Sequence, residues 1–250
     1  MSMHTGKKIA IVTGGASGLG LSIAEKFIAH DILTIIIGRD QEKLQRTRAE
    51  LGESCIPYQF DLTRLEQIPS LVDQIISEYG RIDILVNNAG IHLKKPLTEV
   101  TDQEFQRVIT TNLTAVFSIS REISRIMLKQ QSGCILNISS MAAQYGIPQV
   151  IAYTAAKSAI EGMTRAMAVE LSSHGIRVNC IAPGFIATAM SSGAMDNDPE
   201  RKRKVLSRTP MSHFGRPDDI ADAACFLTSD AAGYITGTVL PVDGGNSIGF

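Results

Sequence analysis

Short, mostly aliphatic runs alternate along the chain with longer segments whose apolar residues recur at helical spacing. Runs that lack a polar residue at every second position are typical of strands covered on both faces of a sheet. They predict seven strands, at residues 9–12, 32–37, 56–60, 82–86, 134–138, 178–181 and 239–242. The intervening segments predict helices at residues 19–29, 41–51, 65–79, 104–129, 153–173 and 217–228.

This alternation predicts an α/β protein with a doubly wound, Rossmann-type fold, in which a seven-stranded parallel sheet carries helices on both faces. Such a sheet binds ligands beyond the carboxyl ends of its strands, where the strand order reverses. No repeat or linker divides the chain, so we predict one nucleotide-binding domain over residues 1–250. Residues 184–198 are the least regular stretch, and we expect a substrate loop or lid from residue 184 to about residue 210.

The charges of the chain nearly cancel, with 24 Lys and Arg residues against 25 Asp and Glu residues. No block of five like charges occurs, which argues against nucleic acid and against an anionic membrane as partners. The basic stretch 201–204 predicts an exposed helix face after Pro199, and a docking patch for an anionic partner is the alternative.

The cysteines, Cys55, Cys134, Cys180 and Cys225, lie far apart, with no CxxC pair and no Cys/His cluster. This spacing argues against disulfides and against a metal site. The N-terminal residues show no apolar leader segment, and no apolar run is long enough for a membrane span. Together these features predict a cytoplasmic protein.

A glycine-rich turn that contains Gly14, Ser17, Gly18, Leu19 and Gly20 joins the first predicted strand to the first predicted helix. Glycines let the backbone turn tightly and approach a pyrophosphate, whose charge is stabilised by the free amides at the helix N-terminus. The glycine spacing differs from the general dinucleotide fingerprint. We predict a nucleotide-binding turn, and an ordinary tight connection is the alternative.

The end of the second predicted strand is expected to lie over the adenosine ribose, where an acidic residue would bind the 2′-hydroxyl and an arginine a 2′-phosphate. Arg39 occupies this place, so NADP(H) is favoured. Asp40 follows; it can cap the next helix or favour NAD(H), which therefore stays an alternative. At the end of the third strand, Asp61 can accept from the adenine amino group or cap a helix.

Tyr153 and Lys157 lie four residues apart in a predicted helix and therefore share a helix face. A lysine ammonium and an oxidised nicotinamide beside the phenol would lower its pKa from about 10 towards about 7. Tyr153 could then exchange a proton with a ketone or an alcohol. An ordinary surface pair of Tyr and Lys is the alternative. Ser139 and Ser140 close the fifth strand, and only one of them can face the cleft, because neighbouring strand residues point to opposite faces.

These motifs, in this order and over nearly the whole chain, resemble the short-chain dehydrogenase/reductase family. The glycine turn resembles its cofactor motif, Asn87-Asn88-Ala89-Gly90 its motif after the fourth strand, and Tyr153 with Lys157 its Tyr-x3-Lys signature. The resemblance implies a catalytic tetrad of Asn112, Ser140, Tyr153 and Lys157. In this tetrad Ser140 would bind the substrate oxygen and Tyr153 would exchange the proton. Lys157 would hold the nicotinamide ribose and lower the pKa of Tyr153, and Asn112 would position a water that links Lys157 to solvent.

The resemblance also implies a set of cofactor-binding residues and an assembly. Pro183-Gly184 resembles the turn of the family after the sixth strand, and Val242-Asp243-Gly244-Gly245 resembles its ending, in a strand that helps to assemble a homotetramer. The implied cofactor-binding residues are Gly14, Ser17, Gly18, Leu19, Gly20, Arg39, Asp61, Leu62, Asn88, Gly90, Tyr153, Lys157, Pro183, Gly184, Ile186 and Thr188.

Within the family the chain most resembles 3-oxoacyl-carrier-protein reductases and gluconate 5-dehydrogenases. The implied function is the NAD(P)(H)-dependent interconversion of a secondary alcohol and a ketone, the latter carried on a thioester or present in a sugar acid or polyol. Lys94 and Lys95 could hold a substrate carboxylate or phosphate, with a solvated loop rim as the alternative, and His92 is expected to be a loop residue. A catalytically silent nucleotide-binding regulator of the same fold is the alternative from another class.

Overall fold

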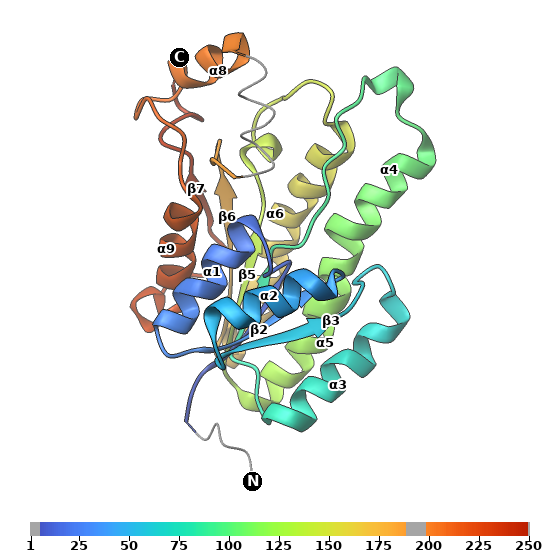
Figure 1. Cartoon of the computed structure of the whole chain (residues 1–250), viewed down its shortest axis with the longest axis vertical. Helices are drawn as coiled ribbons and strands as arrows, with labels where there is room; N and C mark the ends of the chain where they lie inside the picture. The colour runs from blue at the N-terminus through green and yellow to red at the C-terminus, as the bar shows by residue number, and fades with distance from the viewer. Residues whose placement is uncertain (1–5, 189–198, 250) are drawn as a thin grey trace.

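The computed structural model describes residues 6–188 and 199–249 and shows one parallel sheet between layers of helices (Figure 1). The strand order is β3-β2-β1-β4-β5-β6-β7, so it reverses between β1 and β4. This confirms the predicted fold class, and each of the seven strands lies within two residues of its predicted bounds. The strands are β1 (Ile9–Thr13), β2 (Leu33–Gly38), β3 (Cys55–Gln59), β4 (Ile84–Asn87), β5 (Gly133–Ile138), β6 (Ile176–Pro183) and β7 (Val239–Val242).

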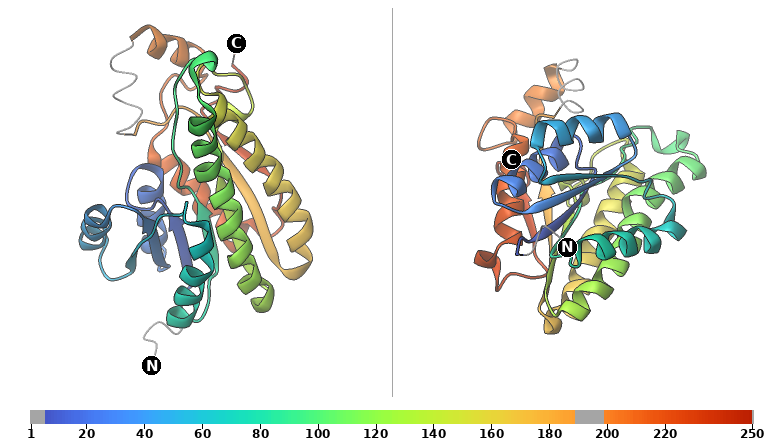
Figure 2. Two further views of the ribbon diagram at one scale, coloured as in Figure 1. Left: turned by 90° about the vertical axis from the view of Figure 1, so that its right-hand side faces the viewer. Right: turned by 60° about the horizontal axis from the view of Figure 1, so that its bottom comes forward.

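The helices α1, α2 and α9 cover one face of the sheet, and α3, α5 and α6 cover the other (Figure 2). The predicted helix over residues 104–129 is present, but it contains a π-helical turn, Thr110–Thr114, that separates α4 from α5 while the backbone stays helical. Apolar periodicity does not reveal such a turn, since the turn shifts the spacing by only one residue. The helices are α1 (Gly18–Ala29), α2 (Gln41–Leu51), α3 (Ile68–Tyr79), α4 (Asp102–Ile109), α5 (Ala115–Gln130), α6 (Ile151–Leu171), α8 (Pro199–Ser207) and α9 (Pro217–Thr228).

The apolar core lies on both faces of the central strands. Ile9 and Ile11 of β1 pack into the cluster under α3, α5 and α6, whereas Ala10 and Val12 pack into the cluster under α1 and α9. Full burial of one large aliphatic side chain stabilises a fold by about 1.5–3 kcal/mol. The two-sided core therefore fixes the central strands, whose carboxyl ends carry the predicted site. Among the described residues, no helix is both long and apolar enough to cross a membrane.

The edge strands depart from the predicted burial on both faces. In β3 only Cys55 is buried, and every residue of β7 is at least partly exposed. An edge strand has a neighbour on one side only, so its other side cannot be covered by the sheet.

A proline stands in each edge strand at a residue that points away from the sheet. Successive residues of a strand direct their N–H and C=O groups to opposite edges. Phe60 N donates to Gly38 O across 2.8 Å, so Pro57, three residues earlier, faces outward. In β7, Val242 O accepts from Gly184 N across 3.0 Å, so the adjacent Pro241 also faces outward. Each proline removes an N–H group that would otherwise have lain unpaired at the edge.

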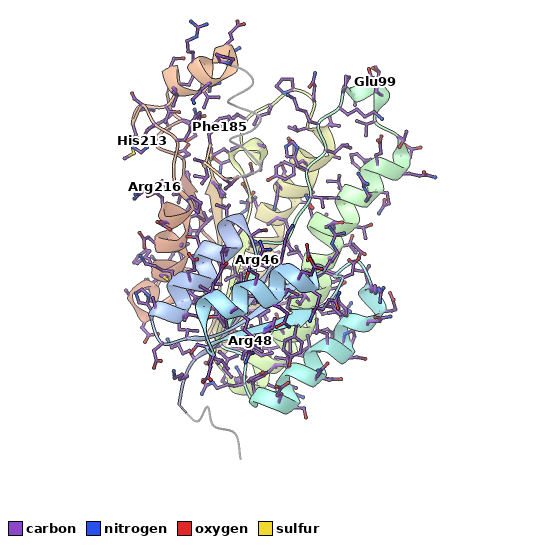
Figure 3. The ribbon with its side chains drawn as sticks, in the orientation of Figure 1. Arg46, Arg48, Glu99, Phe185, His213 and Arg216 are labelled. Carbon is purple, nitrogen blue, oxygen red and sulfur yellow. The ribbon has the colours of Figure 1, made fainter. Side chains whose placement is uncertain are left out.

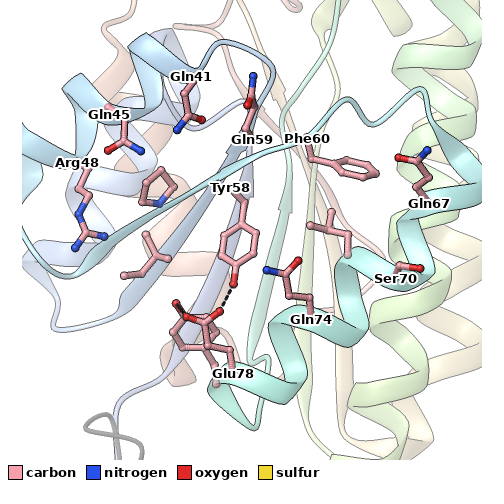
Figure 4. A pocket seen from close by; sticks show the side chains of 14 residues that line it. Gln41, Gln45, Arg48, Tyr58, Gln59, Phe60, Gln67, Ser70, Gln74 and Glu78 are labelled. Carbon is pink, nitrogen blue, oxygen red and sulfur yellow. Dashed lines mark hydrogen bonds between the residues drawn. The ribbon is translucent and has the colours of Figure 1, made fainter.

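A polar groove of about 1050 Å³ runs beside β3, between α2 and α3 (Figure 4). Amide and charged side chains from both helices line it, and the Tyr58 hydroxyl on its floor donates to Glu78 Oε2 across 2.5 Å. None of the four predicted catalytic residues lines this groove. The size of a hollow therefore does not locate the active site of this chain.

Candidate active site

The glycine turn lies at the carboxyl end of β1, beside the reversal of strand order. Gly20 is packed so closely that an added Cβ would lie 2.3 Å from the Gly14 carbonyl oxygen. Gly14 and Gly18 have φ angles of +67° and +54°, which other residues rarely adopt. The shape of the turn therefore requires glycine at all three positions.

Two polar residues brace this turn against β4. The Asn88 amide donates to the carbonyl oxygens of Thr13, across 2.9 Å, and Gly14, across 3.3 Å. The Thr13 hydroxyl accepts from the N–H groups of Asn88 and Ala89, each across 3.0 Å. The Asn88 side chain thus shapes the turn, and a direct contact between Asn88 and the cofactor stays a prediction.

The N-terminus of α1 has the features of a phosphate site. Ser17 is its N-cap residue but makes no side-chain cap bond, and the first turn of the helix holds no acidic residue. No described atom would lie within 4 Å of a Cβ added at Gly18, so the backbone is open on that side. Free amides and the helix dipole stabilise a phosphate there. The pyrophosphate of a nicotinamide dinucleotide fits these residues.

Arg39 lies exposed just beyond the carboxyl end of β2, where a cofactor ribose is expected. The neighbouring Asp40 is the N-cap of α2, and its Oδ1 accepts from Lys43 N across 3.1 Å. Of the two roles predicted for Asp40, helix capping and a preference for NAD(H), the structure shows helix capping. Its carboxylate is engaged by the helix, whereas the Arg39 guanidinium is exposed to solvent.

Asp61 closes a local turn after β3. Its Oδ1 accepts from the N–H of Thr63 across 3.0 Å and from the Thr63 hydroxyl across 2.8 Å. The alternative that Asp61 caps a helix is wrong, because the next helical turn begins after Arg64. Leu62 is partly buried against the core. Contacts of Asp61 and Leu62 with adenine stay predictions.

The two serines after β5 point to different surroundings. Ser139 is buried, and its hydroxyl lies 3.0 Å from Glu161 Oε1 and 3.2 Å from the Lys157 carbonyl oxygen. Ser140 is partly exposed, accepts from Ala142 N across 3.1 Å and acts as a hydrogen-bond partner that lowers the pKa of Tyr153. The geometry therefore directs Ser140, and not Ser139, towards the phenol.

Tyr153 and Lys157 share a face of α6, as their spacing predicts. The Lys157 ammonium lies 5.7 Å from the centroid of the Tyr153 ring and donates to the Ile138 carbonyl oxygen across 2.6 Å. The ring of His92, in the loop after β4, also contacts Tyr153. The centroids of the two rings are 4.8 Å apart, and the ring planes are inclined by 45°. His92 lies in a loop, as predicted, and its ring also packs against the phenol.

Burial shifts the pKa values of both residues of this pair. Desolvation lowers the pKa of Lys157 to about 8. Desolvation also raises the pKa of Tyr153, and the hydrogen bond with Ser140 only partly opposes it. The protein without its cofactor therefore does not lower the pKa of the phenol as predicted, because the effect of burial exceeds that of the hydrogen bond with Ser140. A fall induced by the positive nicotinamide stays a prediction.

Asn112 lies in the π-helical turn between α4 and α5 and is fully buried. Its Oδ1 accepts from Ile91 N across 2.8 Å, and its Nδ2 donates to Ile91 O across 2.8 Å. A Cβ at Gly90 would lie 3.3 Å from the Asn112 Oδ1, which is a tight contact. The side chain therefore holds the loop after β4, and the contact of Asn112 with a water stays a prediction.

The segment after β6 packs tightly against the C-terminal strand. A Cβ at Gly184 would lie 2.6 Å from Asp243 Cβ, so this turn after Pro183 requires glycine. Ile186 forms an isolated bridge with Gly215. The predicted cofactor residues therefore lie on a fixed segment as far as Thr188, and residues 189–198 of the predicted lid lie outside the described residues.

The loop after β4 carries two lysines with different surroundings. Lys95 forms an ion pair with Glu104 across 2.9 Å. Lys94 is exposed, and no carboxylate of the described residues lies within ion-pair distance of it. Of the two lysines predicted to hold a substrate anion, only Lys94 forms no ion pair within the described residues.

The family model described as enoyl-(acyl carrier protein) reductase matches residues 14–247, from the glycine turn to the C-terminal strand. The chain belongs to the short-chain dehydrogenase/reductase family. It is therefore an oxidoreductase that acts on alcohol or keto groups with a nicotinamide cofactor.

Relatives in this family bear the names of different enzymes. The 3-oxoacyl-(acyl-carrier-protein) reductase FabG of Thermotoga maritima is 38% identical over 243 residues, which are 95% of this chain and 97% of that protein. The 3alpha-hydroxysteroid dehydrogenase of Mediterraneibacter gnavus is 39% identical over 250 residues, which are 98% of each protein.

Solved structures of other short-chain dehydrogenase/reductases have the same fold along the whole chain. A candidate gluconate dehydrogenase from Agrobacterium tumefaciens is 36% identical, with a TM-score of 0.93 over 98% of this chain and 97% of that chain. A variant of the actinorhodin polyketide ketoreductase, solved with NADPH, is 30% identical, with a TM-score of 0.91 over 97% of this chain and 98% of that chain.

Sequence reasoning missed two partners of the short-chain dehydrogenase/reductase site. The Ile138 carbonyl oxygen fixes the Lys157 ammonium, but a backbone acceptor has no signature in the residue types. His92 packs against Tyr153 although many residues separate them in the chain, so only the fold brings them together. A signal for His92 existed in its position just beyond Ile91, which follows the Asn87–Gly90 motif at the border of the cleft.

The lowered pKa of Lys157 predicts a pH dependence of stability. A lysine whose folded pKa is about 8 contributes stability that is fully present above its unfolded pKa of 10.5 and lost as pH falls through about 8. Between pH 8 and pH 10.5 the free energy of unfolding of the cofactor-free protein should therefore rise relative to that of Lys157→Met, by about 3 kcal/mol at most. Urea unfolding at several pH values measures this difference. The same comparison with Lys129→Met, at an exposed lysine of α5, should be flat, and a flat difference for Lys157→Met would contradict the lowered pKa.

Proposed function

We propose that this chain is an NADP(H)-preferring reductase that interconverts a ketone and a secondary alcohol, with Tyr153 as the acid and base. The observation that carries the proposal is the convergence of three groups at the carboxyl end of β5. Ser140 interacts with the Tyr153 phenol, and the Lys157 ammonium lies 5.7 Å from the phenol ring. A silent nucleotide-binding regulator would not need this arrangement.

The roles of these residues follow from their surroundings. When bound, the nicotinamide supplies or accepts the hydride. Burial raises the pKa of Tyr153, so the phenol keeps its proton at neutral pH and can give it to a ketone oxygen. Ser140 would donate to the same oxygen and hold it in line with the phenol. Lys157, fixed by the Ile138 carbonyl, would stabilise the phenolate that the transfer leaves.

The preference for NADP(H) rests on Arg39. Its guanidinium is exposed where the 2′-phosphate would lie, and two parallel N–H bonds to a phosphate are strong and directional. Asp40 does not compete, because it caps α2.

A 3-oxoacyl thioester is the substrate class that we propose first, since relatives named as 3-oxoacyl-carrier-protein reductases align over nearly the whole chain. A sugar acid or polyol is the second candidate, supported by the fold match to the candidate gluconate dehydrogenase. The described parts of the predicted substrate loop, residues 184–188 and 199–210, contribute Phe185 and Val205 to a hollow at the same edge of the sheet.

Initial rates with NADPH and NADH against acetoacetyl-coenzyme A and 5-ketogluconate test the proposal. We expect turnover of the thioester, faster with NADPH. Turnover of the sugar acid alone would move the substrate to the second candidate. Cofactor binding without turnover of any ketone in a broader panel would contradict an enzyme and favour the regulator.

A homotetramer is the assembly that we propose, because large apolar side chains are exposed on two separate faces. Phe117 of α5 and Val169 of α6 are 48% and 86% exposed, and these helices lie side by side (Figure 2). Phe226 of α9 and Tyr234 near β7 are 45% and 105% exposed. Two self-complementary faces on one subunit generate a closed tetramer.

The scattered free cysteines support a reducing, cytoplasmic location.

A further inference from the structure

A hollow of about 470 Å³ lies between the 145–149 loop, Phe185 and α8, and combines apolar walls with a basic rim. Ile147 and Pro148 line it from the loop, and Val205 lines it from α8. In Figure 3 Phe185 lies below α8, close to the end of β6. A volume of this size holds a small organic molecule.

None of the four predicted catalytic residues lines the hollow itself, but the chain segment that joins two of them does. Its wall, residues 145–149, is the segment of the chain between Ser140 and Tyr153. The Gln149 carbonyl oxygen of this wall accepts from Lys95 N across 2.8 Å, which ties the wall to the loop after β4. A molecule whose keto group reaches Tyr153 and whose body passes this wall would enter the hollow.

Three cations from two segments line the hollow: Lys94 after β4, and Lys204 and Arg208 in and just after α8. All three are exposed, and no carboxylate in the described part of the chain lies within 4.0 Å of their charged nitrogens. Glu200 is the acidic side chain among the lining residues. The hollow thus has an excess of positive charge that no internal ion pair neutralises.

The position of Arg208 is fixed by a chain of contacts. Its guanidinium lies 5.5 Å from the centroid of the Tyr145 ring, and the Tyr145 hydroxyl donates to Asn246 Oδ1 across 2.8 Å. The buried Asn246 in turn donates to the Thr209 hydroxyl across 2.9 Å. A cation that is held in place loses less side-chain entropy when it binds an anion.

We propose that Lys94, Lys204 and Arg208 bind an anionic group at the far end of a substrate with an apolar body. The proposal rests on the proposed reductase function and narrows its substrate class. The apolar walls formed by Ile147, Pro148, Phe185 and Val205 match an acyl or ring body. The anion is a carboxylate of the substrate itself or a phosphate of a thioester carrier, because both offer the same charged oxygens to Arg and Lys.

Two matched substrate pairs test the proposal and separate the two sources of the anion. The first pair is a medium-chain keto acid and its methyl ester; the second is acetoacetyl-coenzyme A and acetoacetyl-N-acetylcysteamine. Rates with NADPH are measured for the wild type, Lys94→Gln, Lys204→Gln and Arg208→Gln. The control is Arg203→Gln, which removes an exposed charge of α8 that does not line the hollow.

We expect each of the three variants to lower kcat/KM for the anionic member of one pair by about 10- to 100-fold. This is the loss expected when one charge-assisted hydrogen bond to the substrate is removed. The neutral member should change by less than about threefold, and Arg203→Gln should leave both unchanged. A loss confined to the keto acid identifies a carboxylate, and a loss confined to the coenzyme A thioester identifies a phosphate. Equal losses for neutral and anionic members, or no loss in the three variants, would overturn the proposal.

A binding measurement separates this proposal from the proposed reductase function. If the wild type turns over none of the four compounds, the reductase function fails. Calorimetric titration of the keto acid and its ester, and of the coenzyme A and N-acetylcysteamine thioesters, into the same variants then decides the anion site. Weaker binding of an anionic member in the three variants, with unchanged binding of its neutral partner, supports the site, and equal affinities in all variants overturn it.

Discussion

Tyr153→Phe should lower kcat for ketone reduction by about 1000-fold, within the 100- to 10,000-fold range of general acid catalysis. The substitution removes one oxygen atom from a ring that His92 and Lys157 already hold in place. The affinity for NADPH should therefore change by less than about threefold. Stopped-flow measurement of NADPH oxidation, with a separate titration of NADPH fluorescence, gives both values.

The matched control for this substitution is Tyr234→Phe. Tyr234 is 105% exposed, and its loss of a hydroxyl should leave kcat unchanged. Retained turnover in Tyr153→Phe would remove the phenol from the mechanism. Loss of both turnover and cofactor affinity would instead show that the hydroxyl has a structural task.

Arg39→Asp should lower kcat/KM for NADPH by at least about 100-fold and leave that for NADH within about tenfold of the wild type. The substitution replaces a charge-assisted bond to the 2′-phosphate by repulsion, and each such bond is worth about 1.5–3 kcal/mol. The ratio of the two kcat/KM values, at fixed ionic strength, measures the effect.

Arg46→Asp provides the control for general electrostatics, because Arg46 is an exposed cation on α2 that lies beyond the helix start (Figure 3). It should change the ratio by less than about threefold. An unchanged ratio in Arg39→Asp would show that the 2′-phosphate is bound elsewhere, and equal shifts in both variants would assign the effect to net charge alone.

The order of the elements and the glycine turn could be predicted because each depends on local chemistry. An aliphatic run that is buried on both faces leaves a clear pattern, and Gly20 is required by a contact within its own turn. The face shared by Tyr153 and Lys157 follows from helical geometry alone. These features therefore follow from a single sequence.

Other features could not be predicted, because they depend on distant parts of the chain. The π-helical turn that carries Asn112 is fixed by the pairing of that side chain with Ile91. The direction of the Tyr153 pKa shift depends on how deeply the fold buries the phenol. Asp61 could have capped a helix by its position, and only the path of the chain to Thr63 shows that it does not.

The outward-facing prolines of the two edge strands restrict how copies of this chain can join. At Pro57 and Pro241 a strand of another molecule would find no N–H group to accept, so the backbone ladder cannot continue across either edge without a gap. Copies must then associate through side chains, whose shapes match in only a few orientations. A strand that adds to either edge therefore lacks one hydrogen bond, which disfavours growth into a ribbon of strands. The two prolines that cause this have no part in catalysis.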